Sequence, residues 1–154
     1  MPAIDGLVFL GRAVERLSVL IAEQSKKVFV EMGIIIPVRS CSLMTVLAAL
    51  DTASATDLAR ELGYSHQLVI QKIPKLVRLG LIQYRPDEAD ARRRIFHLTD
   101  EGIRQLTKFE HCSVLLRTAY QGLFAEVGDI KQLVDQTIDA LNANPLGKRI
   151  DARG

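Results

Sequence analysis

Apolar residues recur every three or four positions along most of the chain, which is the spacing of amphipathic helices. Stripes of this kind cover four segments: residues 7–28, 43–50, 103–127 and 130–141. Gly33 and Pro37 separate the first two segments, and Gly128 separates the last two. The spacing in the first stripe is close to 3.5 residues. It therefore fits a helix packed on its own domain and a helix packed against a partner equally well.

Two short helices joined by a glycine-containing turn are predicted between Ser54 and Gly80. Ser54 and Asp57 form an S-x-x-D capping box, and Gly63 provides the left-handed residue that ends the first helix. Ser65 caps the second helix. Its inward positions have the spacing i, i+4 and i+7: Val69, Ile73 and Leu76. This order predicts a helix-turn-helix, in which the second helix is the one that reads DNA.

A β-hairpin with a long tip is expected directly after this pair of helices. Residues 81–85 are rich in strand formers, residues 86–90 are typical of a turn, and residues 93–98 alternate basic or polar with apolar side chains. Thr99 then caps a long helix that has acidic residues in its first turn. The predicted fold is mainly α with a small β-hairpin wing.

The charge distribution favours contact with nucleic acid more than the total charge does. The 154 residues carry a net charge of +2, whereas residues 65–94 alone hold seven basic and three acidic side chains, a net charge of +4. A basic helix and hairpin suit phosphate contact, because each neutralised phosphate releases condensed counterions. The length suits a single domain.

Several other classes of protein are not supported. The sequence contains no metalloprotease, phosphate-loop, nucleophile-elbow or dinucleotide motif, so we expect no enzyme and no cofactor. Cys41 and Cys112 have no C-x-x-C spacing and do not cluster with His66, His97 or His111 in a way that suggests zinc, so we expect no metal and two reduced, buried thiols. No apolar run approaches the length of a membrane span, and no signal peptide is recognised; we expect a cytoplasmic protein without a membrane partner.

Three segments carry a resemblance to a known family: TDLARELGYS at 56–65, LVRLGLI at 76–82, and DARRRIFHLTDEG at 90–102. Through them the chain resembles the MarR-type winged-helix regulators of bacteria and archaea. The most specific part is the D-x-R of Asp90 and Arg92, followed at the family's distance by L-T-x-x-G. The resemblance covers residues 43–102 well, and the order of flanking helices fits the remainder.

The resemblance implies a homodimer with one winged helix-turn-helix lobe on each side. The DNA-binding lobe would be residues 38–101, the helical dimerisation region residues 1–37 and 102–145, and residues 146–154 a flexible tail. Arg92 would enter the minor groove, with Asp90 holding it in place. A local pair that only stiffens the turn is the alternative interpretation. Members of the family often respond to small aromatic or phenolic effectors bound between the dimer helices and the lobe, although no residue here identifies such a ligand.

The predicted function is a sequence-specific DNA-binding transcriptional regulator, a ligand-responsive homodimeric repressor that binds double-stranded DNA at a pseudo-palindromic operator. The alternative is a winged-helix protein-interaction module without DNA binding. Pro74 departs from the family, and we expect it to kink the reading helix, because it cannot donate to the Ile70 carbonyl. The predicted DNA-binding residues are Ser65, His66, Gln67, Ile70, Gln71, Lys75, Arg85, Asp90, Arg92, Arg93 and Arg94.

Overall fold

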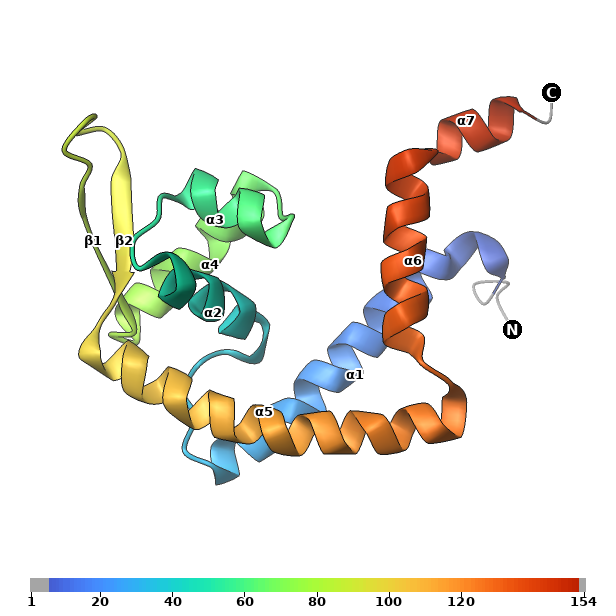
Figure 1. The fold of residues 1–154 in the computed structure, drawn as a ribbon, viewed down its shortest axis with the longest axis horizontal. Helices are drawn as coiled ribbons and strands as arrows, with labels where there is room; N and C mark the ends of the chain where they lie inside the picture. Colours follow the sequence, from blue (N-terminus) through green and yellow to red (C-terminus); the bar gives the residue numbers. More distant parts are fainter. Residues whose placement is uncertain (1–5, 153–154) are drawn as a thin grey trace. The chain divides into compact units, whose positions relative to one another are not determined.

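Helices dominate residues 6–152, the part of the chain that the computed structural model describes (Figure 1). The elements in chain order are a 3₁₀ turn η1 (Leu7–Phe9), α1 (Leu10–Glu31), a 3₁₀ turn η2 (Val38–Ser40), α2 (Cys41–Leu50), α3 (Ala55–Leu62), α4 (His66–Arg78), β1 (Ile82–Pro86), β2 (Arg94–Leu98), α5 (Asp100–Val127), α6 (Ile130–Ala143) and α7 (Leu146–Asp151). The expected fold, mainly α with one hairpin, is confirmed.

The chain divides into two units, one ending at Cys112 and the other beginning at Ser113, so that α5 passes from the first into the second. The first unit holds α1 to α4, the hairpin and the first part of α5. The second holds the rest of α5 together with α6 and α7. Across the described residues, no helix combines the length and the apolar character needed to cross a membrane.

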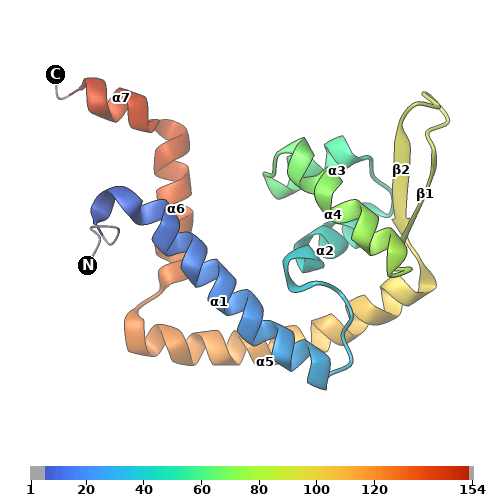
Figure 2. The ribbon, with the colours of Figure 1, turned by 180° about the vertical axis from the view of Figure 1, so that it is seen from behind.

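Within the first unit, α2, α3, α4 and the hairpin enclose one apolar core (Figure 2). Each of these elements contributes side chains that are almost completely inaccessible to solvent. Burying a side chain of this size stabilises the fold by about 1.5–3 kcal/mol. The central set is Leu43, Met44, Leu47, Leu58, Val69, Leu76, Leu81 and Ile82.

The local signals in the sequence position the two helices of the helix-turn-helix. The Ser54–Asp57 capping box is present: the Ser54 hydroxyl accepts from the Asp57 amide, and the Asp57 carboxylate accepts from the Ser54 amide. Gly63 has a φ of 65°, in the left-handed region that favours glycine, and it ends α3. The Ser65 side chain accepts from the Leu68 amide at the start of α4. These predicted helix ends are confirmed.

The hairpin is attached to the lobe through the middle of β2. Strands β1 and β2 are antiparallel, with a register that runs from Ile82 opposite Leu98 to Pro86 opposite Arg94. Ala53, just before α3, adds a single bridge to Phe96 through two backbone hydrogen bonds of 3.1 and 2.8 Å. The hairpin and the entrance to α3 are therefore joined through the backbone.

The segment expected to be a flexible tail contains a further helix. This helix is α7, Leu146–Asp151, which begins directly after Pro145 and has no buried residue. The Arg149 guanidinium donates to the Asn144 and Ala140 carbonyls at the end of α6. The Ala140 carbonyl also accepts from the Asn144 amide, and the two bonds from Arg149 link α7 to the end of α6. The last two residues of the predicted tail, 153–154, lie outside the described residues.

Candidate nucleic-acid interface

The exposed face of α4 is set by the buried one. Val69, Ile73 and Leu76 are 0%, 6% and 0% exposed and fix the rotation of the helix on the core. Six of the predicted residues, at the N-cap and along the helix, are exposed to solvent: Ser65, His66, Gln67, Ile70, Gln71 and Lys75. The helix continues through Pro74 to Arg78, so the proline does not end it. Because Pro74 has no amide hydrogen, the Ile70 carbonyl lacks its usual partner in the helix.

The tip of the hairpin presents Arg92 to solvent. The Asp90 carboxylate accepts a hydrogen bond of 3.0 Å from the Arg92 amide, and its Oδ1 lies 3.5 Å from Arg92 Nε. The Arg92 side chain is nevertheless 94% exposed. Asp90 therefore shapes the turn and approaches the base of the guanidinium, while the rest of the group remains free to meet a ligand.

Arg94 lies on the aromatic surface of the hairpin. Its guanidinium carbon is 4.5 Å from the centroid of the Tyr84 ring, and Tyr84 packs against Phe96 with 5.9 Å between ring centroids. Stacking of a guanidinium on an aromatic face limits its motion without neutralising its charge. Arg85, the other predicted wing residue, is exposed and opposite Ile95 in the register.

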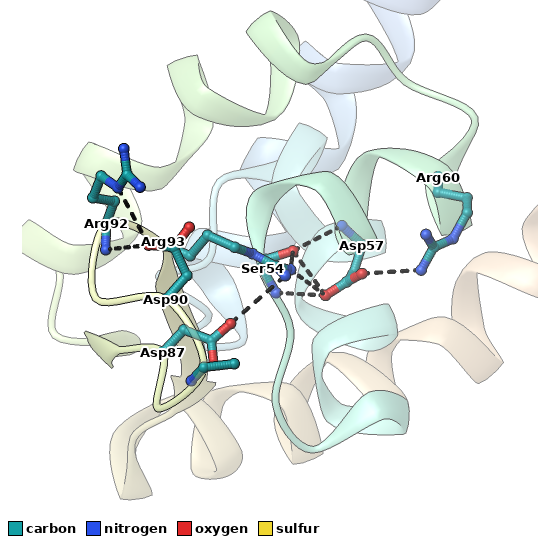
Figure 3. Close-up of polar contacts among 8 residues, drawn as sticks. Ser54, Asp57, Arg60, Asp87, Asp90, Arg92 and Arg93 are labelled. Carbon is teal, nitrogen blue, oxygen red and sulfur yellow. Dashed lines mark hydrogen bonds and ion pairs between the residues drawn. The ribbon is translucent and has the colours of Figure 1, made fainter.

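Arg93 differs from both of its arginine neighbours, because its guanidinium turns back to the protein. One terminal nitrogen donates to the Ser54 hydroxyl at 2.9 Å and lies 3.7 Å from the Asp57 carboxylate. The other lies 3.6 Å from the Asp87 carboxylate. Figure 3 shows Arg93 between these groups, which come from the start of α3 and from the hairpin turn.

The carboxylate at the start of α3 is held in its ionised form. The Ser54 backbone amide and then the Ser54 hydroxyl donate to it, and Arg60 adds a hydrogen bond of 3.0 Å; together they lower the pKa of Asp57 below its usual value. The Ser54 hydroxyl donates to Asp57 and accepts from the Asp57 amide and from Arg93, so its bonding capacity is used.

An open cavity of about 380 Å³ lies between α4, the start of α3 and the hairpin. On α4 it is lined by residues one turn apart, His66, Ile70 and Pro74, and on the hairpin by the three arginines. The cavity thus brings together five of the predicted residues, and the others do not line it: His66, Ile70, Arg92, Arg93 and Arg94. Sequence analysis did not identify Pro74 as part of this surface, and the i, i+4, i+8 spacing was the signal that could have done so.

Neither cysteine has the properties of a reactive group. Cys41 and Cys112 are both buried and free. Burial, and then the neighbouring Cys112 thiol, raise the pKa of Cys41 to about 12, and burial raises the pKa of Cys112. Both thiols are therefore protonated near neutral pH, whereas nucleophilic chemistry needs the thiolate. Among the described residues, no group of three or more His, Cys, Asp or Glu side chains could hold a metal ion.

A helix-turn-helix followed by a two-stranded hairpin, with a basic exposed surface shared by both, defines this chain as a winged helix-turn-helix protein. A family model described as MarR family matches residues 36–93, from the end of the α1–α2 connection into the hairpin. This winged-helix segment is similar to the MarR family, and the chain as a whole has the fold of solved MarR-family transcriptional regulators.

Many solved structures share this fold. The PcaV transcriptional regulator from Streptomyces coelicolor, in complex with its natural ligand, is 18% identical, with a TM-score of 0.65 over 94% of this chain and 96% of that one. A MarR mutant from E. coli, complexed with operator DNA, is 15% identical, with a TM-score of 0.68 over 89% and 99%. BldR from Sulfolobus solfataricus is 18% identical, with a TM-score of 0.58 over 93% and 99%. A search of curated protein sequences finds no match.

Proposed function

We propose that this chain is a sequence-specific DNA-binding transcriptional regulator that acts as a homodimer in the cytoplasm. One observation carries the proposal: exposed residues of α4 and the Arg92 side chain, which is 94% exposed, line the same cavity of one lobe. Residues 38–101 would form the DNA-binding lobe, and residues 1–37 and 102–145 the dimerisation region. The MarR mutant solved with operator DNA supports this use of the fold.

In the proposed complex, α4 enters the major groove. A helix with side chains is about 10–12 Å in diameter and the groove is about 12 Å wide, so one helix fills it. Gln67 and Gln71 carry the amide group that pairs with adenine, and Ile70 offers an apolar contact to thymine methyls. Ser65, His66 and Lys75 lie where they could meet phosphates or base edges.

The hairpin contributes through the minor groove and the phosphate backbone. Arg92 carries a guanidinium that is free over most of its surface, and a narrow A·T-rich minor groove attracts such a group by its negative potential. Asp90 would act on DNA only indirectly, by fixing the turn from which Arg92 projects. Arg85 and Arg94 add positive charge along the strands, where phosphate contacts position a protein without reading sequence.

The second unit supports self-association. None of the residues of α6 or α7 is buried within the chain, although α6 has an apolar stripe. Leu133 and Ile138 on that stripe are 61% and 52% exposed. Apolar surface of this extent on helices marks a protein interface, and a second copy of the chain is the partner that a family of homodimers favours. The two lobes would then reach successive major grooves, about 34–36 Å apart, on a pseudo-palindromic operator.

Repression and a response to a small aromatic or phenolic effector are finer parts of the same proposal. A cavity of about 250 Å³ lies between α1 and η2, and its lining is apolar except for Ser18 and Arg39. A guanidinium beside apolar walls suits a single aromatic ring that carries a carboxylate or phenolate. Lys72 on α4 donates a hydrogen bond of 2.9 Å to the Arg39 carbonyl, so a ligand here would touch the segment that holds α4.

The test is duplex binding across a series of salt concentrations, first with fragments of genomic DNA and then with footprinting on any fragment retained. A regulator that contacts several phosphates loses affinity steeply between 50 and 200 mM salt, by about 10³-fold or more for six contacts. A protein-interaction module would bind no duplex at any salt concentration. The footprint would also give the spacing between half-sites, which tests the homodimer.

A further inference from the structure

Three arginines follow one another in the wing: Arg92, Arg93 and Arg94. Of these, only Arg93 has recorded partners both in the hairpin and at the start of the helix-turn-helix. Its guanidinium binds the Ser54 hydroxyl and faces Asp57 at the start of α3, and it faces Asp87 in the hairpin turn. Because two carboxylates face this guanidinium, much of its charge is offset before DNA is present.

The position of Arg93 along the hairpin gives these contacts a mechanical consequence. The backbone bridge between Ala53 and Phe96 holds the middle of β2, and the ladder of β1 and β2 ends at Pro86 and Arg94. Residues 87–93 lie beyond that ladder. Within this turn the Arg93 carbonyl accepts from the Asp87 amide, and its own amide donates to the Asp90 carbonyl, both at 2.9 Å. Arg93 therefore connects the turn to α3 at a point the strands do not reach.

We propose that Arg93 is a positioning residue, which fixes the wing against the capping box of α3 so that the neighbouring Arg92 is presented to DNA. This inference rests on the proposed function, because it concerns how that interface is held. It assigns to Arg93 a role different from the direct DNA contact expected from sequence. A guanidinium is suited to it, since its separate nitrogens reach Ser54 and Asp87 at once, whereas an ammonium is a single point of charge.

The first test uses a substitution for which a change of charge and a loss of positioning predict opposite changes in DNA affinity. Asp87→Asn removes a negative charge from the DNA-facing surface, which on electrostatic grounds alone strengthens binding. It also removes an ionic partner of Arg93, while the side-chain oxygen that accepts from the Ala89 amide is retained. Glu88→Gln, at the exposed neighbouring position, makes the same charge change outside this network. We expect Asp87→Asn to weaken duplex binding about threefold to tenfold and Glu88→Gln to leave it unchanged or tighter.

The second test needs no DNA and therefore separates this inference from the proposed function. Amide hydrogen exchange is measured at residues 87–93 in the free protein, for the wild type, Arg93→Lys and Glu88→Gln. We expect Arg93→Lys to speed exchange of the Asp87 and Arg93 amides about twofold to fivefold, as removal of a partly exposed ion pair predicts, with Glu88→Gln unchanged. The lysine preserves the charge, so a residue that only contacts phosphate would leave exchange unaltered.

Two results overturn the inference, whatever the fate of the proposed function. One is unchanged exchange in Arg93→Lys, which would show that Arg93 does not hold the turn. The other is binding by Asp87→Asn that equals or exceeds that of Glu88→Gln, which would show that the network contributes only charge. If no duplex binds to any variant, the proposed function fails, and the exchange measurement alone decides the role of Arg93.

Discussion

The Leu81 carbonyl oxygen lies against the Cα of Gly102, so close that a Cβ on residue 102 would overlap it. The same oxygen accepts a hydrogen bond of 3.0 Å from the Thr99 amide, and the Thr99 hydroxyl accepts one of 3.0 Å from the Gly102 amide. The L-T-x-x-G segment is therefore the joint where the start of α5 packs against the residue that leads into β1. Its threonine caps the helix, and its glycine permits the close approach.

The close approach at this joint predicts that adding a single methyl group at Gly102 lowers the stability of the protein. Gly102→Ala should destabilise the protein by about 2–4 kcal/mol, because the contact is with rigid backbone and one of the two segments must shift. Denaturant unfolding followed by circular dichroism measures it. Gly122→Ala is the matched control: this glycine also lies within α5, but nothing stands within 4 Å of its Cβ position. That substitution should stabilise the helix by about 0.5–1 kcal/mol. Equal effects of the two changes would contradict the packing described here.

The capping box predicts a dependence of stability on pH. The pKa of Asp57 is lowered in the folded protein, first by the Ser54 amide and hydroxyl and then by Arg60. A carboxyl group with a lowered folded pKa contributes stability that is fully present above its unfolded value, near pH 4, and is lost as the pH falls through the folded pKa. The free energy of unfolding of wild type should therefore exceed that of Asp57→Asn at pH 7, and the gap should narrow at pH 2–3. A gap that is independent of pH would exclude an ionic contribution from Asp57.

Much of the lobe could be predicted from sequence because its signals are local. The Ser54–Asp57 box, Gly63 and the Ser65 cap each act within four residues, and the apolar face of α4 follows from one helical period. They locate the helices to within a residue or two. The same reasoning placed the hairpin, since its strands and turn differ in composition.

The partners of Arg93 could not be predicted in this way. Ser54 and Arg93 are 39 positions apart, and three consecutive arginines look alike in sequence. The contact depends on the fold, which brings the end of the hairpin turn to the start of α3, where the Arg93 guanidinium reaches Ser54. The helix α7 was missed for a different reason: it is short, and the hydrogen bonds by which the Arg149 side chain joins it to the end of α6 leave no pattern in the sequence.

The exposed stripe on α6 predicts where self-association can be broken. Ile138→Asp places a charge on an apolar residue that is 52% exposed in the single chain, so it should leave the chain folded and weaken a dimer that buries this surface. The dissociation constant of the dimer should rise at least about tenfold, measured by sedimentation equilibrium. Gln136→Asp adds the same charge at an exposed polar position of the same helix and should have little effect. Unchanged association in Ile138→Asp would remove α6 from the interface.

The exposure of Arg92 predicts weaker DNA binding with unchanged stability. Arg92→Ala removes a side chain that is 94% exposed, so the midpoint of thermal unfolding should stay within a degree or two of the wild type. Duplex affinity should fall about tenfold. The slope of log affinity against log salt concentration should also decrease in magnitude, by about one for each phosphate contact that the variant loses. Lys148→Ala, which removes an exposed cation from α7, outside the proposed dimerisation region, is the control for total charge. If both substitutions weaken binding equally, only the overall charge matters, and the wing does not contact DNA. If only Arg92→Ala weakens binding, the tip of the hairpin contacts DNA.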